Sequence, residues 1–318
     1  MRNGHASISN LRAAHQPCAR PRLAARRAAR GKQQGFSLVE LIIVIVISGI
    51  LATGLSSFIA QPIQGYTDLA RRATLVNAAD NALRRMARDV HSALPNSIRV
   101  SGAALEMINA VDGGRYRDDP PPGDLTKQLE FNKADSEFNL LGQFNSIARP
   151  FVYTNQRLVI YNVGVSGADA YEGINVITPS TTSIAIASDA GLPASDAEDH
   201  ITLSPPGFQF SYASPTQRIY LVDTPISYVC SGTNLYRYTG YKILPKQQAT
   251  DADLIAAGAT RAQVSDQINT NGCTFTYQPG TSQRAGLLTL ALKLTQNLPD
   301  GSTENVQLLH QVHVDNTP

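Results

Sequence analysis

The sequence predicts an α+β protein in which one long N-terminal helix precedes a head of mainly antiparallel β-strands. Three observations predict this fold: an uncharged apolar run at residues 41–60, a helical repeat of apolar residues after it, and short alternating segments from Leu129 onward. We expect four parts in order: a basic leader at 1–35, a transmembrane helix at 36–61, an amphipathic helix at 62–95 and a β-rich globular head at 96–318.

The leader accounts for the slight basicity of the chain. Residues 1–35 hold eight of the 27 basic residues and none of the 25 acidic ones, so the remainder has 19 basic and 25 acidic residues and a net charge of −6. A mature chain with this balance gives no support for nucleic-acid binding. We therefore expect no nucleic acid among its partners.

The apolar run has the length of a membrane span. Its 20 residues would form a helix about 30 Å long, which matches the hydrocarbon core of a bilayer. The only plausible cleavage signal precedes the run, whereas a secretory signal peptide is cut after it, so the helix is expected to remain on the mature chain. The basic leader predicts a single-pass membrane protein with a cytoplasmic N-terminus and a head on the far side of the membrane.

A hexapeptide, Gly35-Phe36-Ser37-Leu38-Val39-Glu40, joins the leader to this run. A charged Glu40 without a partner in lipid is costly, so it needs a cation. A cut after Gly35 would supply one, because Phe36 would then carry a free amine. The pair could form within one helix or between neighbouring chains, and in the second case it would favour polymerisation.

The hexapeptide and the apolar run resemble the class III signal of type IV prepilins and type II secretion pseudopilins. The resemblance implies that a membrane-embedded prepilin peptidase cuts between Gly35 and Phe36 and methylates the amine of Phe36, and that Glu40 acts in subunit assembly. It also implies other major and minor pilins and an inner-membrane assembly platform as partners. The implied location is the inner membrane, with the head in the periplasm, and then a pilus or pseudopilus. The alternative is a plain signal anchor in which the hexapeptide is accidental.

An amphipathic helix is expected to follow the span. Pro62 and Gly65 predict a bend or melted turn where the helix leaves the membrane. Apolar residues then recur at intervals of seven, and Pro95 should end the helix; the repeat comprises Leu69, Val76, Leu83 and Val90.

The polar side of this helix is basic. It carries Arg71, Arg72, Arg84, Arg85 and Arg88. Two of these arginines follow an acid by four residues, Arg72 after Asp68 and Arg84 after Asp80, which predicts two ion pairs. The arginines form either a solvated face with local acidic partners or a docking surface for acidic patches on neighbouring subunits.

The head contains segments with strand character and turn residues between them. The expected strands are at 157–161, 183–186, 200–203, 218–222 and 226–229. A hairpin is expected at the C-terminal end, with strands at 287–294 and 306–314 and a turn at Pro299-Asp300-Gly301.

Two stretches of the head are expected to be surface insertions. The first is the proline-rich segment 118–123, and the second is 247–272. Thr250 and Gly258 resemble the start and stop signals of a short helix within the second.

Two cysteines, Cys230 and Cys273, lie in the head, and Cys18 lies in the leader. A disulfide between the first two is permitted outside the cytoplasm, and closing the loop could stabilise the fold by about 4 kcal/mol. The alternative is two unpaired buried thiols.

Several segments narrow the resemblance. Residues 83–90 and 94–100 resemble the corresponding helix of the J-class pseudopilins. Together with 228–230, 271–277, 286–290 and 311–318 they resemble more closely the MshO family of MSHA (mannose-sensitive haemagglutinin) pilus biogenesis proteins. This resemblance implies a minor pilin that starts or caps a filament.

No motif of an enzyme or of a resident cofactor is present. The chain has no Gly-x-Ser-x-Gly elbow, phosphate-binding glycine loop or His-Glu-x-x-His motif. His310 and His313 are three apart on an expected strand, so they should point to opposite faces. The aspartates at 112, 118, 119, 251 and 253 lack the register of a calcium loop. We therefore expect no catalytic residue, metal or cofactor.

Three functions remain open. The first is a minor pilin of an MSHA-type pilus, the second a minor J-like pseudopilin that supports protein export, and the third a tip adhesin whose head binds a surface ligand.

Overall fold

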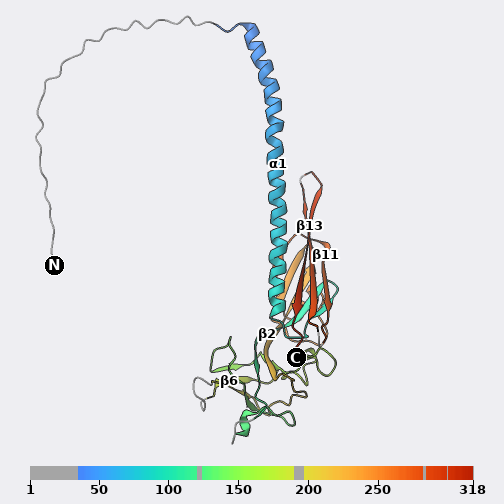
Figure 1. The fold of residues 1–318 in the computed structure, drawn as a ribbon. Helices are drawn as coiled ribbons and strands as arrows, with labels where there is room; N and C mark the ends of the chain where they lie inside the picture. Colours follow the sequence, from blue (N-terminus) through green and yellow to red (C-terminus); the bar gives the residue numbers. More distant parts are fainter. Residues whose placement is uncertain (1–34, 120–123, 190–196, 282–283, 299, 318) are drawn as a thin grey trace, which may run out of the picture. The chain divides into compact units, whose positions relative to one another are not determined.

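The computed structural model describes residues 35–119, 124–189, 197–281, 284–298 and 300–317. The expected leader, the prolines at 120–122 and Pro299 of the expected turn lie outside the described residues. Two helices and thirteen strands are present among the described residues (Figure 1). They are α1 Leu38–His91, β1 Arg99–Ser101, β2 Ala104–Arg115, β3 Glu137–Asn139, β4 Phe151–Tyr153, β5 Arg157–Val159, β6 Ile184–Ser188, β7 Asp199–Leu203, β8 Arg218–Ser231, β9 Asn234–Thr239, α2 Asp251–Ala256, β10 Thr260–Ser265, β11 Ile268–Gln278, β12 Gly286–Asn297 and β13 Thr303–Val314. Two short 3₁₀ helices lie at Leu125–Lys127 and Ala170–Glu172.

This arrangement confirms the predicted α+β fold, a long N-terminal helix followed by mainly antiparallel sheets. The chain divides into two compact units, and the boundary between them falls between Pro62 and Ile63, within helix α1.

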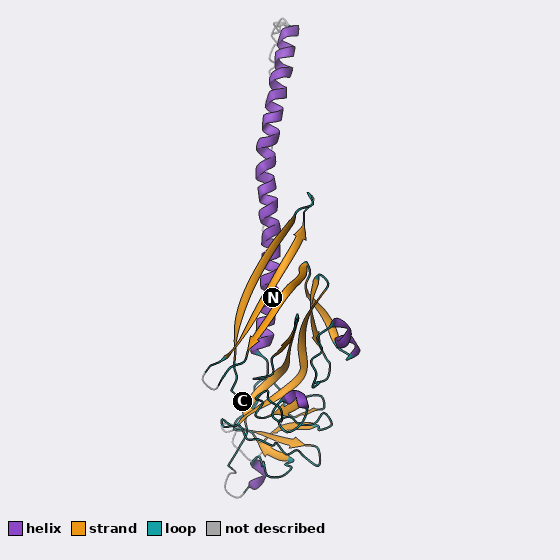
Figure 2. Ribbon diagram, turned by 90° about the vertical axis from the view of Figure 1, so that its right-hand side faces the viewer, coloured by secondary structure: helices purple, strands orange, loops and turns teal. Residues whose placement is uncertain are grey.

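The helical hydrogen-bonding pattern of α1 continues through Pro62 and Gly65 (Figure 2), so the predicted melted turn at these residues is wrong. A proline in a helix removes one hydrogen bond, but helical turns on both sides keep the remaining ladder. The helix ends at His91 rather than at Pro95. The reason is that the backbone N–H of Leu94 already donates to the carbonyl of Ile108 in β2 at 2.8 Å.

The later part of α1 packs against strands β11, β12 and β13. Leu75, Leu83, Met86 and Val90 are buried there among leucines and valines of these strands. Leu69, the first residue of the predicted repeat, is 68% exposed, so the head does not cover the apolar face of the helix at this residue. Apolar side chains of the head contact the helix from Leu75 onward. Leu75 is not a member of the predicted repeat.

The ion pairs of α1 agree with the prediction at one of two places. The Nε of Arg84 lies 2.7 Å from the Oδ2 of Asp80, as expected. Asp68 pairs with Arg71 rather than with Arg72. Side chains three residues apart are neighbours on a helix, as are those four apart. Spacing alone therefore does not decide which arginine pairs with Asp68.

The described strands of the head form three antiparallel sheets. Strands β11-β12-β13 form a meander, β1-β2-β8-β9-β10 form a second sheet in which β5 also pairs with β8, and β3-β7-β6-β4 form a third. The C-terminal hairpin is confirmed, since β12 and β13 pair from Gly286 with Val314 to Asn297 with Thr303.

The central strands differ from the prediction. The two strands expected at 218–222 and 226–229 are one strand, β8, which passes through Pro225. The ladder between β8 and its partner β2 is irregular next to Pro225, where two residues of β8 lie opposite one residue of β2 between Ile108 and Ala110, and a bulge is where a strand tolerates a proline. Strands also begin at Arg99, well before Leu129. Strand β2 was not predicted, because its first five residues are all buried and do not alternate between buried and exposed positions.

The stretch 247–272 is only partly an insertion. Helix α2 is confirmed, with the hydroxyl of Thr250 accepting from the N–H of Asp253 at 3.2 Å and Gly258 at a positive φ of 86°. Strand β10 and the start of β11 follow it in sheet positions, so the expectation of a surface insertion is wrong for that half.

The residues between β2 and β8 build a lobe with its own core. Phe138, Ile184, Ile186 and Ile201 are completely buried in it. Asp118 and Asp119 of the first predicted insertion are exposed at this lobe. The head therefore has one core beneath α1 and another in the inserted lobe.

Candidate functional site

Ser37 and Glu40 shape the start of helix α1. The helix begins at Leu38, and the hydroxyl of Ser37 accepts a hydrogen bond from the N–H of Glu40 at 3.1 Å. Serine followed three residues later by glutamate is the spacing of a capping box, which satisfies free N–H groups at a helix start. Our reading of the sequence missed this role of Ser37, although its signal was present in the hexapeptide.

Gly35 and Phe36 lie in non-helical backbone immediately before this cap. Phe36 is 81% exposed, and a Cβ built at Gly35 would meet no atom within 4 Å. The chain itself therefore does not require glycine at this position. A requirement for a small residue would have to come from an external surface, such as the cleft of a peptidase that grips extended backbone.

The carboxylate of Glu40 lies in the first turn of α1 and is exposed. A negative charge there is stabilised by the helix dipole. Among the described residues, no basic side chain forms an ion pair with Glu40. The carboxylate is thus available to the amine that cleavage would create at Phe36, in the same chain or in a neighbour.

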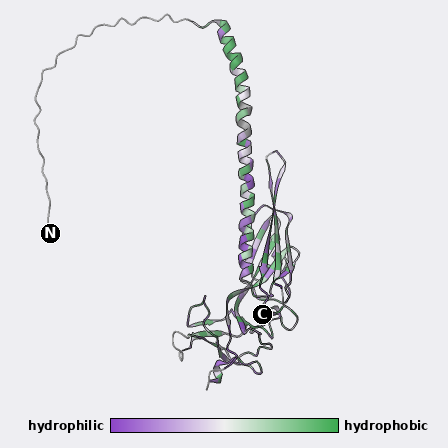
Figure 3. Cartoon of the chain, in the orientation of Figure 1, coloured by the Kyte–Doolittle hydropathy of each residue, from purple (hydrophilic) through white to green (hydrophobic). Residues whose placement is uncertain are grey.

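The part of α1 after Glu40 presents apolar side chains around its whole circumference. The segment Leu38–Leu55 has a mean hydropathy of 2.6 and none of it is buried in the chain. Figure 3 shows this part of the helix in the colour of hydrophobic residues. By length and composition the segment can cross a membrane, and lipid would solvate its exposed side chains.

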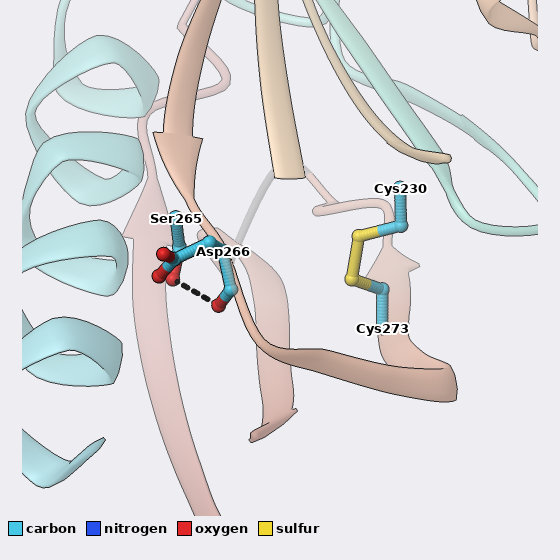
Figure 4. The surroundings of a disulfide bond; sticks show 4 residues. All are labelled: Cys230, Ser265, Asp266 and Cys273. Carbon is cyan, nitrogen blue, oxygen red and sulfur yellow. Dashed lines mark hydrogen bonds between the residues drawn. A yellow bond between two sulfur atoms is a disulfide. The ribbon is translucent and has the colours of Figure 1, made fainter. Parts of the chain in front are cut away.

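In the head, Cys230 of β8 and Cys273 of β11 form a disulfide with their Cα atoms 6.4 Å apart (Figure 4). The bond links two sheets that share no ladder. Nearby, the hydroxyl of Ser265 donates to the carbonyl of Asp266 at 3.1 Å, which holds the turn that leads into β11.

The histidines and aspartates considered as metal ligands are placed separately. His310 and His313 line different grooves of β13. Asp251 accepts from the hydroxyl of Tyr238 at 2.5 Å and pairs with Arg261, and Asp112 accepts from the N–H of Ser146 at 2.5 Å. The part of the chain that the structure describes contains no group of three His, Cys, Asp or Glu residues that could hold a metal ion.

Two buried polar clusters in the head were missed by the sequence analysis. Asp89 of α1 accepts from the hydroxyl of Tyr228 and from the Nε of Arg237, both at 2.6 Å. Burial, reinforced by the carboxylate of Asp89, raises the pKa of Tyr228, so the phenol stays protonated and donates. No sequence signal marks such a partnership, because its members lie more than a hundred residues apart.

The second cluster surrounds Glu106 of β2, which is fully buried. Its carboxylate accepts from the Nε of Arg99 at 2.6 Å and from the hydroxyl of Tyr241 at 2.8 Å. Burial raises the pKa of Glu106, and Arg99 opposes that effect. The guanidinium also lies 3.5 Å above the ring of Tyr171, so the cluster joins β1 and β2 to two loops.

Comparison with known proteins identifies the N-terminal segment alone. Residues 30–56 match the family model of the prokaryotic N-terminal methylation motif, which covers the hexapeptide and most of the apolar run. No curated protein and no solved structure matches the chain significantly. The chain therefore carries a prokaryotic N-terminal methylation motif at the start of helix α1.

Proposed function

We propose that this chain is a minor pilin-like subunit of an MSHA-type type IV pilus, which helps to initiate or cap the filament. The observation that carries the proposal is the methylation motif on the apolar segment Leu38–Leu55, whose only acid, Glu40, follows the expected cleavage point by five residues. The resemblance of several helix and head segments to the MshO family supports the choice of the MSHA system.

The features of the N-terminal site support each step of this function. Exposed Gly35 and Phe36 suit cleavage by a prepilin peptidase and methylation of the new amine. The carboxylate of Glu40, which forms no ion pair with another described residue, suits pairing with the amine of an incoming neighbour. The apolar segment after it suits storage in the inner membrane before assembly.

The head supports a low-copy position. Its described residues form several hydrophobic clusters, the two largest beneath α1 and in the inserted lobe, and this lobe between β2 and β8 adds bulk that a densely repeated shaft would have to accommodate at every subunit. The disulfide between Cys230 and Cys273 suits an oxidising compartment beyond the inner membrane.

Mass spectrometry of the chain from its native cell tests the processing step. We expect an N-terminal N-methylphenylalanine at Phe36, and any other mature N-terminus contradicts the proposal. Deletion of the gene tests the type of system. We expect loss of surface pili with secretion intact, whereas blocked export of secreted enzymes with normal piliation would assign the chain to a type II secretion pseudopilus.

A further inference from the structure

A basic groove of about 710 Å³ lies between the later part of helix α1 and the strands beside it. Helix α1 contributes Arg84, Arg85 and Arg88 to its lining. Val264 of β10 and His310 of β13 line it from the sheets. The groove belongs entirely to the unit Ile63–Pro318.

The arginines of the groove are only partly neutralised. All three side chains are exposed, and Asp80 pairs with Arg84. Within the described residues, Arg85 and Arg88 form no ion pair. Like charges three and four residues apart destabilise a helix. The repulsion among these arginines therefore destabilises α1, and an anionic partner would remove that effect.

The charge of the groove is opposite to that of the mature chain. Without the leader the chain has 19 basic and 25 acidic residues, yet the groove presents three guanidinium groups. Guanidinium groups bind carboxylates through paired hydrogen bonds. A groove of this kind is therefore complementary to an acidic surface.

The spacing of Arg84 and Arg88 fits acids on one face of an extended ligand. Arg84 and Arg88 are four residues apart on α1, which separates them by about 6 Å along the helix axis. In an extended segment, alternate side chains on one face are separated by about 7 Å. Acids at alternate positions of an extended segment would therefore meet these guanidinium groups in turn, above the small side chains of Ala87 and Val264 that also line the groove.

We propose that this groove binds an extended acidic segment of a neighbouring filament subunit, with carboxylates at alternate positions held by Arg84, Arg85 and Arg88. The identity of the neighbour rests on the proposed function, whereas the chemistry of the groove does not. A single-stranded nucleic acid is less suited, because no Phe, Tyr or Trp side chain lines the groove to stack on bases.

Binding of a labelled hexapeptide of alternating glutamate and serine to the full chain in detergent, followed by fluorescence anisotropy, tests the proposal. We expect salt-sensitive binding that weakens about tenfold or more in the double variant Arg85→Glu with Arg88→Glu. The matched control is Arg72→Glu with Lys246→Glu, which makes the same charge change at exposed residues outside the groove. This control should bind within about twofold of the unmodified chain.

Three outcomes would overturn the proposal: no binding of the peptide, equal losses in both double variants, or tighter binding of a twelve-residue oligothymidine that the groove variant abolishes. In the native cell, the groove variant should be cut after Gly35 as usual but should enter filaments poorly. Failure of cutting in the unmodified chain would instead contradict the proposed function and leave peptide binding as an independent result.

Discussion

The carboxylate of Asp89 on helix α1 accepts a hydrogen bond from the Nε of Arg237 on strand β9 at 2.6 Å. Both side chains are about four-fifths buried, and the hydroxyl of Tyr228 completes the arrangement. Hydrophobic contacts between α1 and the sheets are not directional, so they allow several rotations of the helix. A buried ion pair with a third partner selects one of them.

Replacement of Asp89 by Ala should destabilise the head by about 2–3 kcal/mol, because it leaves a buried guanidinium without its carboxylate. Chemical denaturation of the full chain in detergent, followed by circular dichroism, measures the change. The control is Asp80→Ala, whose ion pair with Arg84 is exposed and should contribute at most about 0.5 kcal/mol. Equal effects of the two substitutions would show that the pair at Asp89 has no special role.

Substitution of Gly35 should affect processing without affecting the fold, since no atom lies within 4 Å of a Cβ built there. We expect Gly35→Ala to be cut partly and Gly35→Leu not to be cut, as judged from the size of the chain in membranes. Normal maturation of Gly35→Leu would remove the claim of a peptidase that requires a small residue.

Glu40→Ala should be cut normally but should assemble poorly, because the new amine of Phe36 loses its counter-charge. The ratio of chain in sheared filaments to chain in membranes measures this effect. Ser37→Ala is a useful control, because it removes the helix cap at a cost of about 1 kcal/mol while keeping the carboxylate. Incorporation of the Glu40 variant at the normal level would show that pairing between neighbours is unimportant.

Replacement of Cys230 and Cys273 by Ser should lower the free energy of unfolding by about 4 kcal/mol, since the bond closes a separation of 43 residues in the unfolded chain. Denaturation of the unmodified chain with and without a reductant should give a difference of similar size. A reductant effect that persists in the double variant would mean that the stability loss does not come from this bond.

Glu106 should make the stability of the head depend on pH. Burial raises its pKa above the ordinary value of 4.5, so the folded state holds the proton more tightly than the unfolded state. Its contribution to stability is complete below the ordinary pKa and is lost as the pH rises through the raised one. The free energy of unfolding, relative to Glu106→Gln, should therefore fall between pH 4.5 and neutrality. A rise over this interval would show that Arg99 outweighs the cost of burying the charge.

Local signals in the sequence were sufficient for the features that depend on neighbouring residues. The hexapeptide, the apolar run, the cap at Thr250 and the C-terminal hairpin are each defined within a few residues. Their energetics come from helix caps, turns and the period of apolar side chains, which act over one or two turns of chain. The class of fold and the methylation motif could therefore be predicted.

The tertiary structure decided the features whose partners are distant in the chain. Strand β8 stays whole through Pro225 because its ladder with β2 is bulged beside that residue, and the buried face of α1 starts at Leu75 because the strands cover it from there. The pairing of Asp89 with Arg237, and the groove that places His310 beside Arg88, join segments more than a hundred residues apart. No local period encodes such contacts, because their free energy arises only when the sheets have formed against the helix.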